Sequence, residues 1–116
     1  MNSEELKKRT NLFAHLCVRL ALSLPKNRLG NHISGQLIRC ATSVASNYRA
    51  VCLSQSKAGF IAKLSIVIEE ADESQFWLEF LVDEELLKRE QVKPLLKEAE
   101  ELTAIFVSSR KTARKD

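Results

Sequence analysis

The residues best suited to chemistry in this sequence are the carboxylates between residues 69 and 85. This segment carries eight acids and no Lys or Arg, namely Glu69, Glu70, Asp72, Glu73, Glu79, Asp83, Glu84 and Glu85. Clustered carboxylates on a helix can hold metal ions, but di-iron bundles combine them with Glu-x-x-His motifs on two helices. No Glu-x-x-His occurs here, and neither His15 nor His32 has an acid beside it. The sequence therefore predicts no metal site.

No nucleophile is placed for catalysis either. Cys17, Cys40 and Cys52 form no Cys-x-x-Cys pair, and each lies on or beside an apolar helical stripe, where a reduced thiol behaves as a small hydrophobe. A Ser/His/Asp set and a Gly-rich phosphate loop are both absent. We therefore expect a protein that is not an enzyme and uses no cofactor.

The cysteines and the distribution of apolar residues indicate the cellular compartment of the protein. Unpaired cysteines favour a reducing compartment. Residues 1–9 are polar with no apolar signal-peptide core close behind them, and no apolar run reaches the ~20 residues that a membrane helix needs. We expect a cytoplasmic protein with no membrane contact.

The acid cluster belongs to a long amphipathic segment over residues 57–87, with Ser56 as its expected N-terminal cap. Its apolar residues recur at spacings of three and four, it contains no Pro, and its only Gly lies in the first turn. A helix of about 30 residues would be roughly 45 Å long and needs other helices to cover it. Three more helices are predicted: one that starts after a cap at Asn2 or Ser3 and stops at Pro25, one over residues 31–53, and one that starts between Glu90 and Lys93.

These elements predict an all-α fold. Short connections make consecutive helices antiparallel neighbours, so the expected architecture is an up-down-up-down four-helix bundle. Residues 26–31 are predicted as a polar loop with Gly30 as its breaker, and Leu16 and Cys17 as part of the core stripe of the first helix. The predicted domain covers residues 1–109, and residues 110–116 are predicted as a basic, flexible tail.

One face of this bundle is predicted to form a subunit interface. Phe76 and Phe80 point away from the core stripe beside clustered acids, and residues of the second helix on its other flank are mostly small. Arg39 falls at the level of Glu70 to Glu73 and is expected to pair with Glu69, Glu70 or Glu73, in its own subunit or in a neighbour. The candidate interface residues are Arg39, Ser43, Glu69, Glu73, Phe76 and Phe80. Alternatively, another helix of the chain covers the two Phe rings, and Arg39 is simply solvated.

The charge distribution points to a second kind of partner. Fourteen bases and fourteen acids balance up to residue 106, so the net charge of +3 comes entirely from the last ten residues. Phosphate binding needs little more than placed Lys and Arg side chains. The candidate nucleic-acid residues are Arg110, Lys111, Arg114 and Lys115, with Lys26 and Arg28 as a second choice. The competing interpretation is a tail that only keeps the protein in solution.

Three runs of this sequence together form a recognisable signature. They are Gln36–Ala50 (QLIRCATSVASNYRA), Phe60–Val67 (FIAKLSIV) and Glu70–Glu79 (EADESQFWLE). They contain Gln-x-x-Arg-x-Ala-x-Ser and Glu-x-x-Glu-x-x-x-Trp-Leu. The signature resembles the bacterial four-helix bundle proteins first noticed as reading frames inside intervening sequences of 23S ribosomal RNA genes, and the resemblance covers about residues 8–112. Many members carry Asn-x-x-Glu-Gly where Asn47 is here followed by Tyr48-Arg49-Ala50.

The resemblance implies a left-handed bundle, a ring-shaped homopentamer and no enzymatic activity. The family is similar to the accessory variability proteins of diversity-generating retroelements, which are basic pentamers that bind nucleic acid and a reverse transcriptase. The leading hypothesis is therefore a homo-oligomeric protein that binds RNA or DNA, most simply structured RNA such as ribosomal RNA. The alternative is a structural assembly or protein adaptor with no nucleic-acid role.

Overall fold

The computed structural model describes all 116 residues and contains four α-helices and no strand. They are α1 (Ser3–Leu22), α2 (Arg28–Cys52), α3 (Lys57–Asp83) and α4 (Arg89–Lys115). The predicted all-α, four-helix fold is therefore confirmed. No helix is long and apolar enough to cross a membrane.

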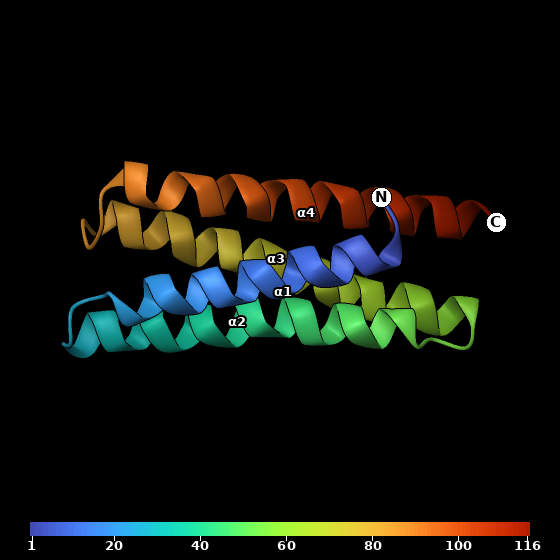
Figure 1. Ribbon diagram of the computed structural model, residues 1–116, viewed down its shortest axis with the longest axis horizontal. Coiled ribbons are helices and arrows are strands. Elements are labelled where there is room, and N and C mark those ends of the chain that lie inside the picture. The colour runs from blue at the N-terminus through green and yellow to red at the C-terminus, as the bar shows by residue number, and fades with distance from the viewer.

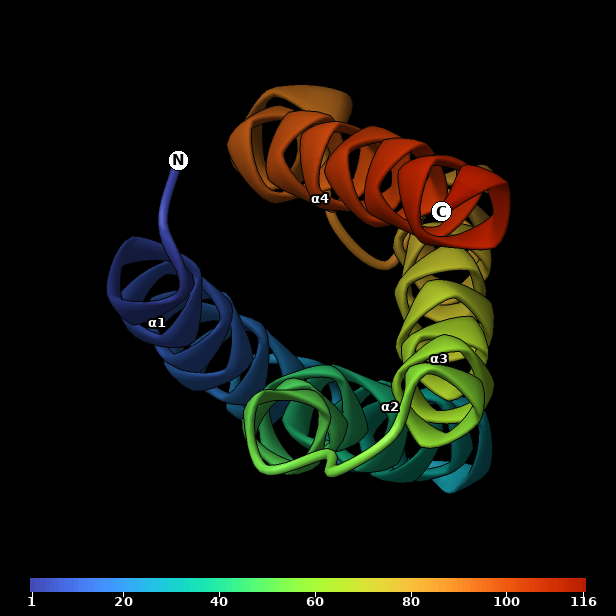
Figure 2. The ribbon, with the colours of Figure 1, turned by 90° about the vertical axis from the view of Figure 1, so that its right-hand side faces the viewer.

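The helices form a rod with extents of 47 × 20 × 20 Å. The α1–α2 and α3–α4 connections lie at one end of the rod, and both termini lie towards the other end, where α2 connects to α3 (Figure 1). Viewed along the rod, the helices follow one another around the axis in chain order (Figure 2). Contacts between α1 and α4 are much sparser than contacts between consecutive helices, so the α1–α4 side is the least closely packed.

Polar caps fix the start of the first three helices. The side chains of Asn2, Asn27 and Ser56 accept hydrogen bonds from backbone N–H groups of the first turns, at 2.9, 2.8 and 3.0 Å. Such caps satisfy donors that have no partner within the helix. The caps at Asn2 and Ser56 are those that the sequence predicts.

The start of α2 corrects one prediction. Gly30 is not a loop breaker, because Asn27 caps α2 and places Gly30, buried, in the first helical turn. A Cβ atom at Gly30 would lie 1.9 Å from the carbonyl oxygen of Pro25. Glycine is required here because the α1–α2 connection passes directly against the helix backbone.

The α3–α4 connection begins earlier than predicted. α3 ends at Asp83 rather than near residue 87, and Glu85 adopts a left-handed conformation with φ 59°. The N–H groups of Glu85 and Leu86 donate to the carbonyls of Val82 and Leu81 at 2.9 and 3.0 Å, the pattern of a Schellman motif. Glu85 therefore occupies a position that usually holds Gly.

Both ends of α4 also differ from prediction. α4 begins at Arg89, where the Gln91 side chain accepts from the Lys88 N–H at 3.0 Å, so Pro94 is the sixth helical residue rather than part of the first turn. At the other end, residues 110–115 continue the helix instead of forming a separate segment. Gly and Pro are absent beyond Pro94, so no residue type in this stretch ends the helix.

The core runs along the whole rod and draws on every helix. Phe13, Leu37, Leu78 and Phe106 are among its fully buried large side chains. Leu16 does not join them: 45% of its surface is exposed, although Cys17 beside it is completely buried. α1 is covered closely by α2 but only sparsely by α4, which leaves part of the predicted apolar stripe of α1 in solvent.

Candidate assembly and nucleic-acid surfaces

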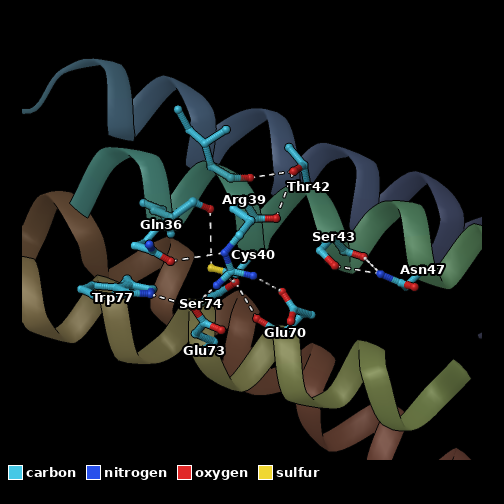
Figure 3. Close-up of polar contacts among 12 residues, drawn as sticks. Gln36, Arg39, Cys40, Thr42, Ser43, Asn47, Glu70, Glu73, Ser74 and Trp77 are labelled. Carbon is cyan, nitrogen blue, oxygen red and sulfur yellow. Dashed lines mark hydrogen bonds and ion pairs between the residues drawn. The ribbon is translucent and has the colours of Figure 1, made fainter. Parts of the chain in front are cut away.

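An ionic cluster joins α2 to α3 at mid-height of the bundle. Arg39 Nη1 lies 3.0 Å from Glu70 Oε2, and Arg39 Nη2 pairs with Glu73 Oε2 (Figure 3). The Gln36 side-chain oxygen accepts from Arg39 Nε at 3.3 Å. The predicted pairing of Arg39 is therefore present within one chain. Glu69, the third predicted partner, is exposed and makes no ion pair.

This cluster lies near the surface rather than in the core. The Arg39 side chain is 48% exposed, and those of Glu70 and Glu73 are 17% and 34% exposed. Exposed pairs contribute about 0–1 kcal/mol, because water screens the charges and two long side chains lose freedom. Loss of Arg39 is therefore expected to cost less than loss of one partner of a buried ion pair.

An aromatic cluster continues the ionic one along α3. Trp77 Nε1 donates to Glu73 Oε2 at 3.0 Å. The Trp77 ring lies 4.9 Å from Phe76 and 5.8 Å from Phe80, and the two Phe rings stack at 5.6 Å between centroids. His32 of α2 approaches Trp77 edge-on at 5.7 Å.

The two Phe residues differ in burial. Phe76 is 52% exposed, so no helix of the same chain covers it, whereas Phe80 is half-buried against the core. Both were predicted to point outwards, and only Phe76 fully does so. The difference is that Phe80 itself packs against the core, whereas Phe76 contacts only the outer side of Trp77 and Phe80.

The small flank of α2 adjoins this cluster. Asn47 Nδ2 donates to the carbonyl and the hydroxyl oxygen of Ser43 at 3.0 and 2.8 Å, so both side chains bond within α2 and leave α3 unengaged (Figure 3). On α3, Ile66 precedes Glu70, Glu73 and Trp77 at helical spacings and is 42% exposed. We call this continuous surface the aromatic face; it comprises His32, Gln36, Arg39, Ser43, Asn47, Ile66, Glu70, Glu73, Phe76, Trp77 and Phe80.

A second ionic cluster, absent from the sequence-based predictions, joins α1 to α4. Arg9 Nε and Nη2 bind the two oxygens of Glu98 at 2.6 and 2.7 Å, and Nη2 also lies 2.9 Å from Glu101. The hydrogen bond with Glu98 raises the pKa of Arg9, because it favours the charged guanidinium. The sequence signal for this cluster is a pair of carboxylates three residues apart on α4 and a basic residue beside the core stripe of α1.

The predicted nucleic-acid residues lie at opposite ends of the rod. Arg110, Lys111, Arg114 and Lys115 occupy the last turns of α4, and Lys26 and Arg28 lie at the α1–α2 connection (Figure 1). Arg110 Nη1 donates to Ser65 Oγ of α3 at 3.1 Å, whereas Lys111, Arg114 and Lys115 are exposed. Within one chain, the two groups therefore form separate surfaces.

The buried cysteine thiols are poor candidates for a reactive site. Cys17 and Cys40 are buried free thiols, and burial raises the pKa of both above the ordinary range. A thiol that stays protonated is a poor nucleophile. No three His, Cys, Asp or Glu side chains are grouped so that they could hold a metal ion.

Comparisons with known proteins agree with this architecture. Residues 3–108 match the family model described as 23S rRNA-intervening sequence protein. One matching solved structure is the crystal structure of a protein of unknown function from the S23 ribosomal protein family of Bacteroides thetaiotaomicron. It is 32% identical, covers 96% of this chain and 99% of its own, and has a TM-score of 0.88. No curated protein matches. The resemblance read from the sequence is thus confirmed: the chain belongs to the family of 23S rRNA-intervening sequence proteins.

Proposed function

We propose that this chain is a non-enzymatic, cytoplasmic protein that binds structured RNA, such as ribosomal RNA, as a homo-oligomer. Its subunit is an up-down-up-down, left-handed bundle, and the assembly is a ring-shaped homopentamer. The position of the excess positive charge carries the proposal. Lys111, Arg114 and Lys115 are exposed on the last turns of α4 and make no ion pair.

Assembly would multiply this charge. Each subunit adds one basic α4 end, and weak phosphate contacts made by several linked ends gain from effective concentration when one RNA spans them. In a single subunit the same cations would do little more than offset the negative end of the α4 dipole, which is their commonest role.

The aromatic face supports the assembly. Half of the Phe76 surface is exposed beside Trp77 and Phe80. Covering the rest of a half-exposed Phe stabilises a complex by about 1 kcal/mol, and a second copy of the chain would also exclude water from the Arg39 cluster. The interface residues proposed are Arg39, Ser43, Glu69, Glu73, Phe76 and Phe80.

The test compares the wild type with a variant that carries Arg110→Ala, Lys111→Ala, Arg114→Ala and Lys115→Ala. We expect weaker binding to a structured ribosomal RNA fragment and a shallower salt dependence, with oligomer mass and melting temperature nearly unchanged. A matched control replaces Lys88, Arg89, Lys93 and Lys97 at the opposite end of α4. Equal affinities and equal salt slopes for the wild type and the first variant would remove the α4 end from the mechanism.

A protein adaptor is the second candidate, and the exposed Phe76 favours it. Aromatic side chains ringed by polar groups are typical of protein-binding surfaces. In that case the wild type would show no salt-dependent RNA binding, and the aromatic face would bind another protein rather than a second copy.

A further inference from the structure

A groove runs along the outer side of α1 and α2, away from the core. It consists of two adjoining hollows of about 480 and 440 Å³ that share Asn11, Ala45 and Arg49. We call it the α1–α2 groove. Its further lining residues are Lys7, Lys8, Ala14, His15, Val18, Thr42 and Ser46.

The groove is positively charged and lined by no carboxylate. Lys7 and Lys8 form its α1 wall, and Arg49 faces them from α2. α2 contains no acid at all, and the nearest carboxylates of α1 are Glu4, which pairs with Lys7 at 3.1 Å, and Glu5.

Two of the groove cations, Lys8 and Arg49, are free of ion pairs. Arg9 and Arg39 each bind two carboxylates, whereas Lys8 and Arg49 make no ion pair and no hydrogen bond. Both are exposed. Their charges are therefore balanced by nothing in the chain, and an anion in the groove would meet no repulsion from its walls.

The shape of the groove suits an extended polymer. Ala14, Ala45 and Ser46 give it a floor of small side chains, which lets a chain lie close to the two helices. Asn11 makes no hydrogen bond within the protein, so its side-chain amide is free to donate. The start of α1 and the end of α2 lie towards the end of the rod that also holds the C-terminal turns of α4 (Figure 1), but those turns lie across the bundle from the groove (Figure 2).

The groove is also separate from the aromatic face. Thr42 lies on the α1 side of α2, whereas Arg39 reaches α3 from the other side (Figure 3). Arg49 lines the groove together with Thr42 and residues of α1. A second copy of the chain docked on the aromatic face would therefore not cover the groove of that same subunit.

We propose that the α1–α2 groove binds the phosphate backbone of an RNA strand. Lys8 and Arg49 contact phosphates from the two walls, and the Asn11 amide donates a hydrogen bond between them. Contacts of this kind position a strand without reading its bases. This inference rests on the proposed RNA-binding function and names the surface that performs it.

The first test replaces the two unpaired cations with Lys8→Gln/Arg49→Gln. For single-stranded RNA, each lost phosphate contact lowers the log–log salt slope by about 0.7, so two contacts lower it by about 1.4. We expect about 25-fold weaker binding at about 0.1 M salt, with the two titrations converging near 1 M. Lys93→Gln/Lys97→Gln is the control, because it removes the same charge from exposed positions on α4.

The second test blocks the groove without changing its charge. Ser46→Tyr places a ring over the floor, and Ala104→Tyr places the same ring on the outer side of α4 as a control. RNA held in the groove is displaced only by Ser46→Tyr. The probe is a fluorescein-labelled, single-stranded ribosomal RNA fragment, and circular dichroism melts and light scattering check the fold and mass of every variant.

The outcomes distinguish a failure of the groove proposal from a failure of the proposed RNA binding. Weaker binding and a shallower slope for both groove variants, with unchanged controls, support the groove. Wild-type binding that both groove variants retain, but that the α4-end variant loses, overturns the groove and leaves RNA binding in place. No salt-dependent binding by the wild type overturns both.

Discussion

Loss of Arg9 should destabilise the fold more than loss of Arg39, although both residues bind two carboxylates. In Arg9→Met the aliphatic stem is kept and the guanidinium is removed. The Arg9 and Glu98 side chains are only 21% and 26% exposed, and two hydrogen bonds join them at 2.6 and 2.7 Å. The Arg39 side chain is 48% exposed.

The magnitudes follow from this difference in burial. Exposed pairs are worth about 0–1 kcal/mol, and breaking a fully buried pair costs about 3–5 kcal/mol. Arg9 lies between the limits, so Arg9→Met should lower the free energy of unfolding by about 2 kcal/mol. For Arg39→Met we expect about 0.5 kcal/mol, towards the exposed limit. In a chain of this length, about 2 kcal/mol corresponds to a fall in melting temperature of roughly 8 °C.

The assay is urea and thermal unfolding, followed by circular dichroism at one fixed protomer concentration, because oligomerisation makes apparent stability depend on concentration. A double-mutant cycle with Glu98→Gln isolates the pair, and we expect a coupling energy above about 1 kcal/mol. A coupling energy near zero, or a larger loss for Arg39→Met than for Arg9→Met, would refute the reasoning from burial.

Three further predictions concern assembly, the α1–α2 connection and the buried thiols. Phe76→Glu should lower the oligomer mass measured by light scattering while leaving the helical spectrum intact, because Phe76 is exposed in one subunit; unchanged mass would exclude the aromatic face as an interface. Gly30→Ala should lower the free energy of unfolding by more than about 2 kcal/mol, because the added Cβ meets the Pro25 carbonyl; an unchanged urea midpoint would contradict this. Burial raises the pKa of Cys17 and Cys40 above the ordinary 9.0, so their contribution to stability is complete below about pH 9 and is lost as the pH rises towards the folded-state values. Urea titrations at increasing pH should show this loss, up to about 1.4 kcal/mol per pH unit for each thiol, and Cys17→Ala/Cys40→Ala should reduce it; equal pH slopes would disprove it.

Local chemistry explains which parts of the fold the sequence predicts well. Asn2 and Ser56 are caps followed directly by amphipathic stretches, so those helix starts need no tertiary information. Gly30 and Glu85 show the opposite case. From the sequence alone Gly30 is interpreted as a helix breaker, and only the structure shows the Pro25 carbonyl packed against it. Glu85 adopts a left-handed conformation that its residue type does not predict.

Ion pairs between helices depend on the relative register of those helices. The sequence determines this register for helices joined by a short turn but not for helices far apart in the chain. Arg39 could be matched to its partners because α2 and α3 are joined by a short turn, which fixes their relative register. Arg9 pairs with Glu98 across helices at opposite ends of the chain, so counting from a turn gives no register. Leu16 is exposed for a related reason, because the sequence does not say how closely α4 covers α1.

The most direct test of RNA binding measures the affinity of the wild-type oligomer for a ribosomal RNA fragment at a series of salt concentrations. Fluorescence anisotropy from about 0.05 to about 0.5 M salt gives the slope of log affinity against log salt. RNA binding through phosphate contacts predicts a straight line steeper than about −1.4, which corresponds to at least two phosphate contacts on a single strand. A flat line, or no binding at the lowest salt, would contradict it.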